Sequence, residues 1–285
     1  MLAGDRKTVE NALAAAGYDK TIEGAKQYLR DWCDIMKPEY VMASTPHNFV
    51  LREDKGPAAK RLKVGVNEDA MKQPFAFTDL TSNNCAAECD DEEEGLASVI
   101  DENSNLLAEV LMQVCEERDL PLALKIGAHR KVNPSLLQAG DGVVAFADAN
   151  MLARLCTKFP KVRFLATFLS RNNQHQACVL ATKFRNLHIY GCWWYCNNPS
   201  IIEEITKMRV EMLGTAFTAQ HSDSRVLDQL IYKWSHSRAV IANVLAKEYS
   251  KLVESGWSLS RGELRRDINK LFGGSYEEFM AKSFT

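Results

Sequence analysis

Residues 214–238 read Gly-Thr-Ala-Phe-Thr-Ala-Gln-His-Ser-Asp-Ser-Arg-Val-Leu-Asp-Gln-Leu-Ile-Tyr-Lys-Trp-Ser-His-Ser-Arg. The small and β-prone residues 214–219 predict a short buried strand. After Arg225, apolar residues recur at helical spacing and predict a helix. Between the two, His221, Asp223 and Arg225 are spaced by two, so their side chains would share one face of an extended chain. The stretch predicts a polar cluster where a strand ends and a helix begins, the place where α/β proteins bind ligands.

Strands and helices alternate along most of the chain, which indicates a parallel sheet with right-handed crossovers. Asn198 before Pro199 predicts a helix start, and Ser260 with Glu263 predicts a capping box that opens a last helix, closed at 273–274. The predicted strands are 39–44, 61–66, 122–127, 163–168, 187–191 and 214–219. The predicted helices are 7–36 with a break near Gly17, 97–118, 148–158, 173–184, 200–212, the helix after Arg225 and the capped last helix.

Polar or aromatic residues follow several of these strands, and no Gly-x-Gly-x-x-Gly or Walker loop does. Residues from many strand ends form the site of a TIM-type (β/α) barrel. The chain has about six predicted strands and a closed barrel has eight, so we expect an incomplete α/β barrel. We expect residues 1–120 to hold the N-terminal helices, the first strands and an irregular acidic insert. Residues 121–285 would form the C-terminal half of the barrel with its terminal helices.

Composition excludes several classes of function. The chain has 285 residues, and its 35 Lys and Arg nearly balance its 37 Asp and Glu, so no strong field attracts nucleic acid or an anionic membrane. The first residues lack the apolar core of a signal peptide, so we expect a cytoplasmic protein. Eight scattered cysteines at this length predict reduced, packed thiols rather than disulfides.

Four motifs together resemble the uronate isomerase (glucuronate isomerase) family of the amidohydrolase superfamily. They are Leu-Lys-Ile-Gly-Ala-His-Arg at 124–130, Thr-Phe-Leu-Ser-Arg-Asn-Asn-Gln-His at 167–175, Gly-Cys-Trp-Trp-Tyr-Cys-Asn-Asn-Pro-Ser-Ile-Ile-Glu-Glu at 191–204 and the stretch at 214–238. The resemblance covers roughly residues 105–280. It implies an aldose–ketose isomerase that converts D-glucuronate to D-fructuronate and D-galacturonate to D-tagaturonate with the help of a divalent metal such as zinc or manganese.

The resemblance also implies catalytic roles. Asp223 matches the acidic residue after the last barrel strand, which lies at the metal and is a candidate proton carrier. Arg225 matches the arginine of the same Asp-x-Arg motif, and His221 lies beside them. Isomerisation moves a proton from C2 to C1 through an enediol, so a base is needed there. The alternative without a catalytic role is a structural ion pair of Asp223 and Arg225 that caps the following helix.

Other residues are candidates for holding the substrate. Trp193 and Trp194 match the family's tryptophan pair, although core packing is the alternative for at least one of them. Lys125 would point from the middle of a strand into the barrel interior. A sugar acid needs a cation for its carboxylate, and Arg offers a bidentate fork. The arginine candidates, in order, are Arg225, Arg171 and Arg130.

The chain departs from the family in one respect. Full members begin with a strand that carries a His-x-His metal pair, and no His-x-His occurs in this chain. The metal site would then be incomplete, which leaves two functions open: a hexuronate isomerase, or a catalytically impaired barrel that serves as a binding or scaffold protein. An open sheet exposes unpaired edges, so we expect a homo-oligomer.

Overall fold

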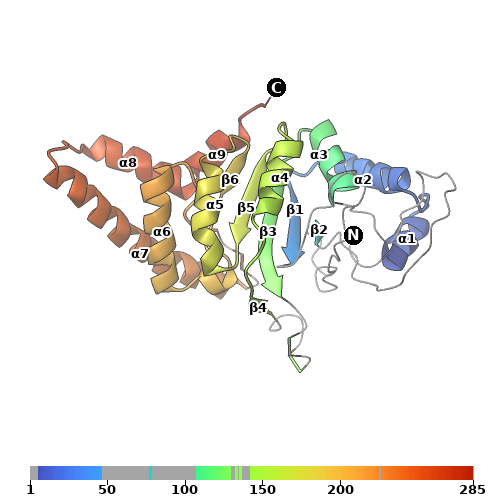
Figure 1. The fold of residues 1–285 in the computed structure, drawn as a ribbon, viewed down its shortest axis with the longest axis horizontal. Helices are drawn as coiled ribbons and strands as arrows, with labels where there is room; N and C mark the ends of the chain where they lie inside the picture. Colours follow the sequence, from blue (N-terminus) through green and yellow to red (C-terminus); the bar gives the residue numbers. More distant parts are fainter. Residues whose placement is uncertain are drawn as a thin grey trace.

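The computed structural model describes residues 6–46, 77–78, 107–129, 132–133, 135–136, 142–221, 223–224 and 226–284. Its centre is an open sheet with the strand order β2-β1-β3-β5-β6, in which all neighbours are parallel, and β4 pairs with β3 in antiparallel fashion (Figure 1). The strands are β1 (Val41–Pro46), β2 (Phe77–Thr78), β3 (Leu122–His129), β4 (Val143–Val144), β5 (Phe164–Phe168) and β6 (Leu187–Ile189). The expected α/β fold with an incomplete barrel is confirmed.

Helices follow most strands, as the alternating pattern predicted. Figure 1 shows α1 and α2 at one end of the molecule and α7 and α8 at the other. The α-helices are α1 (Arg6–Ala15), α2 (Ile22–Met36), α3 (Met112–Glu117), α4 (Asn150–Lys158), α5 (Gln174–Ala181), α6 (Pro199–Leu213), α7 (Leu227–Glu254), α8 (Arg261–Asn269) and α9 (Ser275–Met280). The 3-10 helices are η3 (Arg171–Asn173) and η4 (Trp194–Cys196), and the π-helical turns are η2 (Leu107–Leu111) and η5 (Lys270–Gly274).

The predicted helix boundaries follow from local chemistry. The Asn198 side chain accepts a hydrogen bond from the Ile201 amide, with Pro at the first position of α6. The Ser260 capping box opens α8 as predicted. The helical path breaks at Gly273, with φ of 147°, at the predicted close of this helix, and a further helix that was not predicted, α9, follows.

Some predicted strands differ from the structure. The segment 214–219 extends the sheet by one residue only, through a parallel bridge between Tyr190 and Thr218. The predicted strand 61–66 lies outside the described residues. The two-residue strands β2 and β4 were not predicted, because runs this short carry no periodicity.

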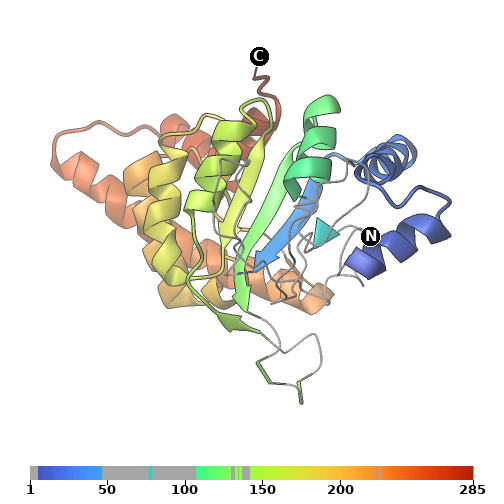
Figure 2. The same cartoon turned by 45° about the vertical axis from the view of Figure 1, so that its right-hand side comes forward.

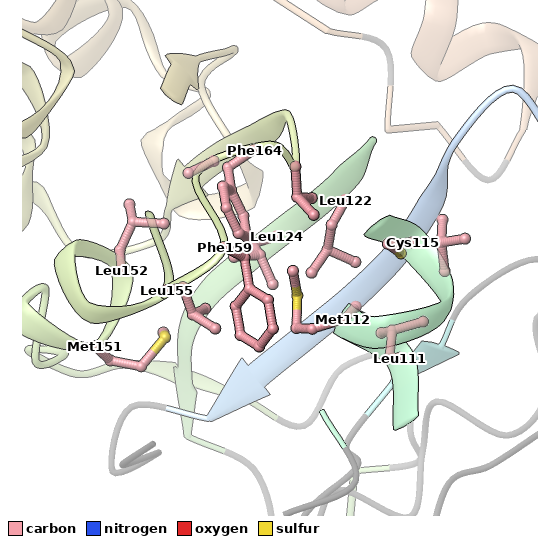
Figure 3. Packing of buried hydrophobic residues seen from close by; sticks show 14 of the residues in the cluster. Leu111, Met112, Cys115, Leu122, Leu124, Met151, Leu152, Leu155, Phe159 and Phe164 are labelled. Atoms are coloured by element: carbon pink, nitrogen blue, oxygen red, sulfur yellow. The ribbon is translucent and has the colours of Figure 1, made fainter. Parts of the chain in front are cut away.

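One face of the sheet carries the main core. Figures 1 and 2 show α4 and α5 over this face. Alternate strand residues such as Leu122, Leu124 and Phe164 point toward Leu155 of α4 and Met112 of α3 (Figure 3). All five side chains are fully buried, and each contributes about 1.5–3 kcal/mol through removal from water. This face fixes the strands in place.

The other face would be the interior of a closed barrel. Ala123 and Leu165 lie on it and pack against Phe279 of α9. Two residues further along the same strands, the side chains on this face are Lys125 and Thr167, which are register partners. The inner face is therefore apolar near the start of the strands and polar near their carboxyl ends.

Candidate functional site

Lys125 and Asp223 form an ion pair on the inner face of the sheet. The Lys125 ammonium lies 2.5 Å from Asp223 Oδ1, although the two residues are 98 positions apart in the chain. The two side chains are only 15% and 28% exposed. The ammonium also lies 5.8 Å from the centroid of the Trp193 ring, which is buried against Ala128 and Leu169. The mid-strand lysine and the exit of the last segment thus meet at one place.

The backbone turns at Asp223. Its φ is +38°, in the left-handed region that Asp tolerates better than most residues, so the chain is not extended here as the spacing of two assumed. Lys233 of α7 donates to the Asp223 carbonyl oxygen at 2.6 Å. This turn, rather than strand alternation, directs the carboxylate toward Lys125.

His221 lies beside this pair in a confined place. Its ring is 5.1 Å from the Tyr190 ring, and a Cβ on Gly191 would lie 1.9 Å from its Cδ2 atom. Gly191 also has φ of +64°, so both the positive φ and the lack of space for a Cβ favour glycine at this position. The His221 Nε2 atom is buried and has no hydrogen-bond partner among the described residues.

Burial holds His221 neutral, and the neighbouring charges hold Asp223 ionised. Burial lowers the pKa of His221 to about 4, with Asp223 opposing and Lys125 adding to the effect. For Asp223, burial acts to raise the pKa, but attraction and hydrogen bonding from Lys125, with smaller contributions from His221 and Lys233, bring it below its ordinary value. Near neutral pH the cluster holds an uncharged imidazole next to a carboxylate–ammonium pair.

Gln220 joins the loop before Asp223 to its surroundings. Its Oε1 atom accepts hydrogen bonds from the backbone amides of Cys192 at 3.1 Å and His221 at 3.0 Å. Its Nε2 atom donates to Asn197 at 2.9 Å and to Ser237 of α7 at 2.7 Å. A single buried amide therefore fixes the exits of two neighbouring segments against α7.

Arg209 of α6 is a buried guanidinium that bonds to Gly191. This guanidinium is 1% exposed and donates to the Gly191 carbonyl at 2.8 Å and to Gln174 Oε1 at 3.1 Å. It also lies 5.8 Å from the centroid of the Phe217 ring. The hydrogen bond to its carbonyl holds the glycine against which His221 packs, while Gln174 and Phe217 hold the guanidinium in place.

The other candidate residues lie elsewhere or outside the described residues. Arg171 is 60% exposed on η3. Its Nε–H donates to Glu204 of α6 at 2.7 Å, so its guanidinium forms a surface ion pair and does not join the Lys125–Asp223 cluster. Trp194 has φ of +45° and stacks on Tyr195 at 4.4 Å. Arg225 and Arg130 lie outside the described residues, so the structure brings together Lys125, Trp193, His221 and Asp223.

The remaining described histidines lie outside this cluster, two in ring stacks and two exposed. His188 is buried, its Nε2 lies 2.8 Å from Thr218 Oγ1, and its ring stacks on Phe279 at 5.0 Å. His236 stacks on Tyr232 on α7. His129 and His175 are exposed.

The described residues do not by themselves fit a divalent metal. No group of three His, Cys, Asp or Glu side chains among them could hold one, whereas zinc takes at least three protein ligands. The Lys125 ammonium already lies against one Asp223 oxygen, where it repels a second cation.

Six cysteines in the described part of the chain are buried free thiols, as expected: Cys33, Cys115, Cys156, Cys178, Cys192 and Cys196.

Several residues of this site were not predicted from the sequence. Lys233, Gln220 and Gly191 act through contacts that no local pattern encodes. Tyr190 and Thr167 stand on predicted strands, but which of their side chains face inward beside Lys125 depends on the register between strands, which alternation along one strand does not give.

An open parallel sheet with polar residues at its strand ends defines an α/β protein of the (β/α) barrel type. Within the described residues no helix is long and apolar enough to cross a membrane. No family model matches the chain, and no curated protein sequence does.

Solved structures do match. A uronate isomerase from Bacillus halodurans C-125 is 34% identical, with a TM-score of 0.76 over 98% of this chain and 56% of that one. A uronate isomerase from Thermotoga maritima shares the fold at 17% identity, with a TM-score of 0.66 over 96% and 57%. A glucuronate isomerase from Caulobacter crescentus is 17% identical, with a TM-score of 0.53 over 64% of this chain and 41% of that one.

The resemblance to the uronate isomerases is thereby confirmed. The chain spans a little over half the length of the first two of these proteins.

Proposed function

We propose that this chain takes part in aldose–ketose isomerisation of hexuronates, converting D-glucuronate to D-fructuronate and D-galacturonate to D-tagaturonate. The likeness to the Bacillus halodurans uronate isomerase supports this class of reaction. The observation that carries the proposal is the cluster of Lys125, Asp223 and His221 on the inner face of the sheet, on the side toward the carboxyl ends of the strands, where barrel enzymes do their chemistry.

The reaction needs a proton to leave C2 and arrive at C1. Asp223 is ionised near neutral pH and accepts the C2 proton, then returns it to C1 of the enediol. The Lys125 ammonium beside Asp223 stabilises the negative charge that develops on the substrate oxygens at C1 and C2. Neutral His221 forms a hydrogen bond to one of these two substrate oxygens through Nε2.

The substrate is an anion, and the charge of the site suits one. The Lys125 ammonium pairs with the Asp223 carboxylate, and the Lys233 ammonium donates to the Asp223 main-chain carbonyl, so these three residues together carry one more positive than negative charge. Arg225, two positions after Asp223, remains the first candidate for the substrate carboxylate. Arg171 is the weaker candidate because Glu204 neutralises it.

Ketose formation from D-glucuronate by the purified chain tests the proposal. The assay is run with added Mn²⁺ or Zn²⁺ and again with a chelator. Asp223→Asn should reduce the rate about 10²- to 10⁴-fold, the range for removal of a general acid–base group. Glu203→Gln, which breaks the exposed Lys247–Glu203 ion pair between α7 and α6, serves as the matched control and should retain the wild-type rate. An Asp223→Asn variant as fast as wild type would remove Asp223 from the mechanism.

The second candidate is binding without turnover. It is favoured by the described residues' lack of a three-ligand metal group and by the ammonium that already occupies the Asp223 carboxylate. Calorimetric binding of D-glucuronate with no ketose formed under either metal condition would support this candidate and contradict the first.

A further inference from the structure

Three buried polar atoms on the inner face of the sheet have no hydrogen-bond partner among the described residues. They are Thr167 Oγ1, Tyr190 Oη and His221 Nε2. Thr167 is 0% exposed, and Tyr190 is half-buried with its hydroxyl inside. Because buried hydroxyl and imidazole groups almost always have partners, three orphaned atoms call for a partner that the described residues do not supply.

The residues that carry these three atoms lie next to one another on the inner face. Thr167 is the register partner of Lys125 on the neighbouring strand. Ile189 pairs with Ala166, so Tyr190 follows at the level of Thr167 on the next strand. The Tyr190 ring lies 5.1 Å from the His221 ring. The residues that carry the orphaned atoms therefore follow one another across neighbouring strands, from Thr167 beside Lys125 to His221.

Other orphaned atoms in the described part of the chain do not gather in this way. Thr206 Oγ1 lies on α6 and the two ring nitrogens of His236 lie on α7. The rest are single Nε atoms of arginine side chains. Only the inner-face group combines two hydroxyls and an imidazole beside a cation.

We propose that Thr167, Tyr190 and His221 form a hydroxyl-binding subsite that takes the polyhydroxylated chain of an open sugar acid, with Lys125 beside its charged end. The subsite rests on the proposed function, since it belongs to the same site. Each hydroxyl group of the protein can donate one hydrogen bond and accept others, which matches successive hydroxyls of a polyol. Burial above all, and then Asp223, raises the pKa of Tyr190, so its phenol keeps the proton with which it donates.

The subsite predicts binding that does not need the reacting carbonyl. D-gluconate has the carboxylate and the hydroxyls of such a chain but no carbonyl, so it cannot be isomerised. Calorimetry with D-gluconate should show saturable binding to the wild-type chain. D-mannitol, which lacks the carboxylate, should bind more weakly, because the Lys125 ammonium then has no anion to attract.

Thr167→Val and Tyr190→Phe remove one hydroxyl each and keep the shape of the side chain. Each should weaken D-gluconate binding about 3- to 10-fold, the effect of one hydrogen bond. Thr206→Val is the matched control, because it removes an equally buried and equally orphaned hydroxyl on α6, and it should leave the affinity unchanged. Thermal unfolding of all three variants confirms that they fold.

The outcomes separate the subsite from the proposed reaction. Unchanged D-gluconate affinity in Thr167→Val and Tyr190→Phe, or no binding to the wild-type chain, would overturn the subsite even if D-glucuronate is isomerised. Weakened binding in both variants, with the Thr206→Val control unaffected, supports the subsite even if no ketose is ever formed.

Discussion

The Lys125–Asp223 pair should contribute measurably to folding stability. Its ammonium and carboxylate are 2.5 Å apart, and a hydrogen bond to a charged group contributes about 1.5–3 kcal/mol when little solvent screens it. The side chains are 15% and 28% exposed, so some screening remains and we expect a coupling free energy of about 2 kcal/mol. A double-mutant cycle measures it: urea unfolding of the wild type, Lys125→Met, Asp223→Asn and the double variant.

A surface pair on the same chain is the control for this cycle. Arg171 and Glu204 are 2.7 Å apart but 60% and 38% exposed. Solvent screens such pairs, so a cycle with Arg171→Met and Glu204→Gln should give a coupling of about 0–0.5 kcal/mol. If the Lys125–Asp223 coupling were no larger than this, the two side chains would not be held together on the inner face, and the geometry of the site would be wrong.

Three further predictions concern the surroundings of the site. Gly191→Ala should destabilise the chain by roughly 1–2 kcal/mol in urea unfolding, because φ is +64° and the new methyl group would displace the His221 ring; an unchanged midpoint would contradict the contact. Burial lowers the pKa of His188 to about 3, below its unfolded value of 6.5, so its contribution to stability is complete above pH 6.5 and is lost as pH falls toward 3, by about 1.4 kcal/mol per pH unit. His188→Phe should flatten that slope in unfolding measured at several pH values, and an equal slope would show that His188 titrates normally. Ser260→Ala should reduce stability by about 1 kcal/mol through loss of the helix cap, and no loss would mean that the cap adds nothing to the fold.

The sequence predicted those parts of the fold that depend on local chemistry. The Asn198 cap and the Ser260 capping box set two helix starts, and each depends on residues within three positions of one another. The strands with buried apolar residues were placed within a few residues of their observed bounds. The exception is 214–219, where the sheet continues by a single bridge at Thr218.

The site could be predicted only in part, because it depends on contacts between distant segments. The likeness of the motifs singled out Asp223, and the spacing of two singled out His221 before it. Neither period nor spacing could show that Asp223 turns through a positive φ toward Lys125 on a strand 98 residues earlier. Gln220 is a similar case, since its four hydrogen bonds join segments that have no common pattern.

The most direct test of the account is whether a hexuronate binds beside His221. In the wild-type chain with labelled histidines, the ring signals of His221 and of exposed His175 are followed by NMR during a titration with D-glucuronate. We predict a saturable shift of the His221 signals and none of His175. His221 signals that stay unmoved throughout the titration would contradict the placement of the sugar acid at this cluster.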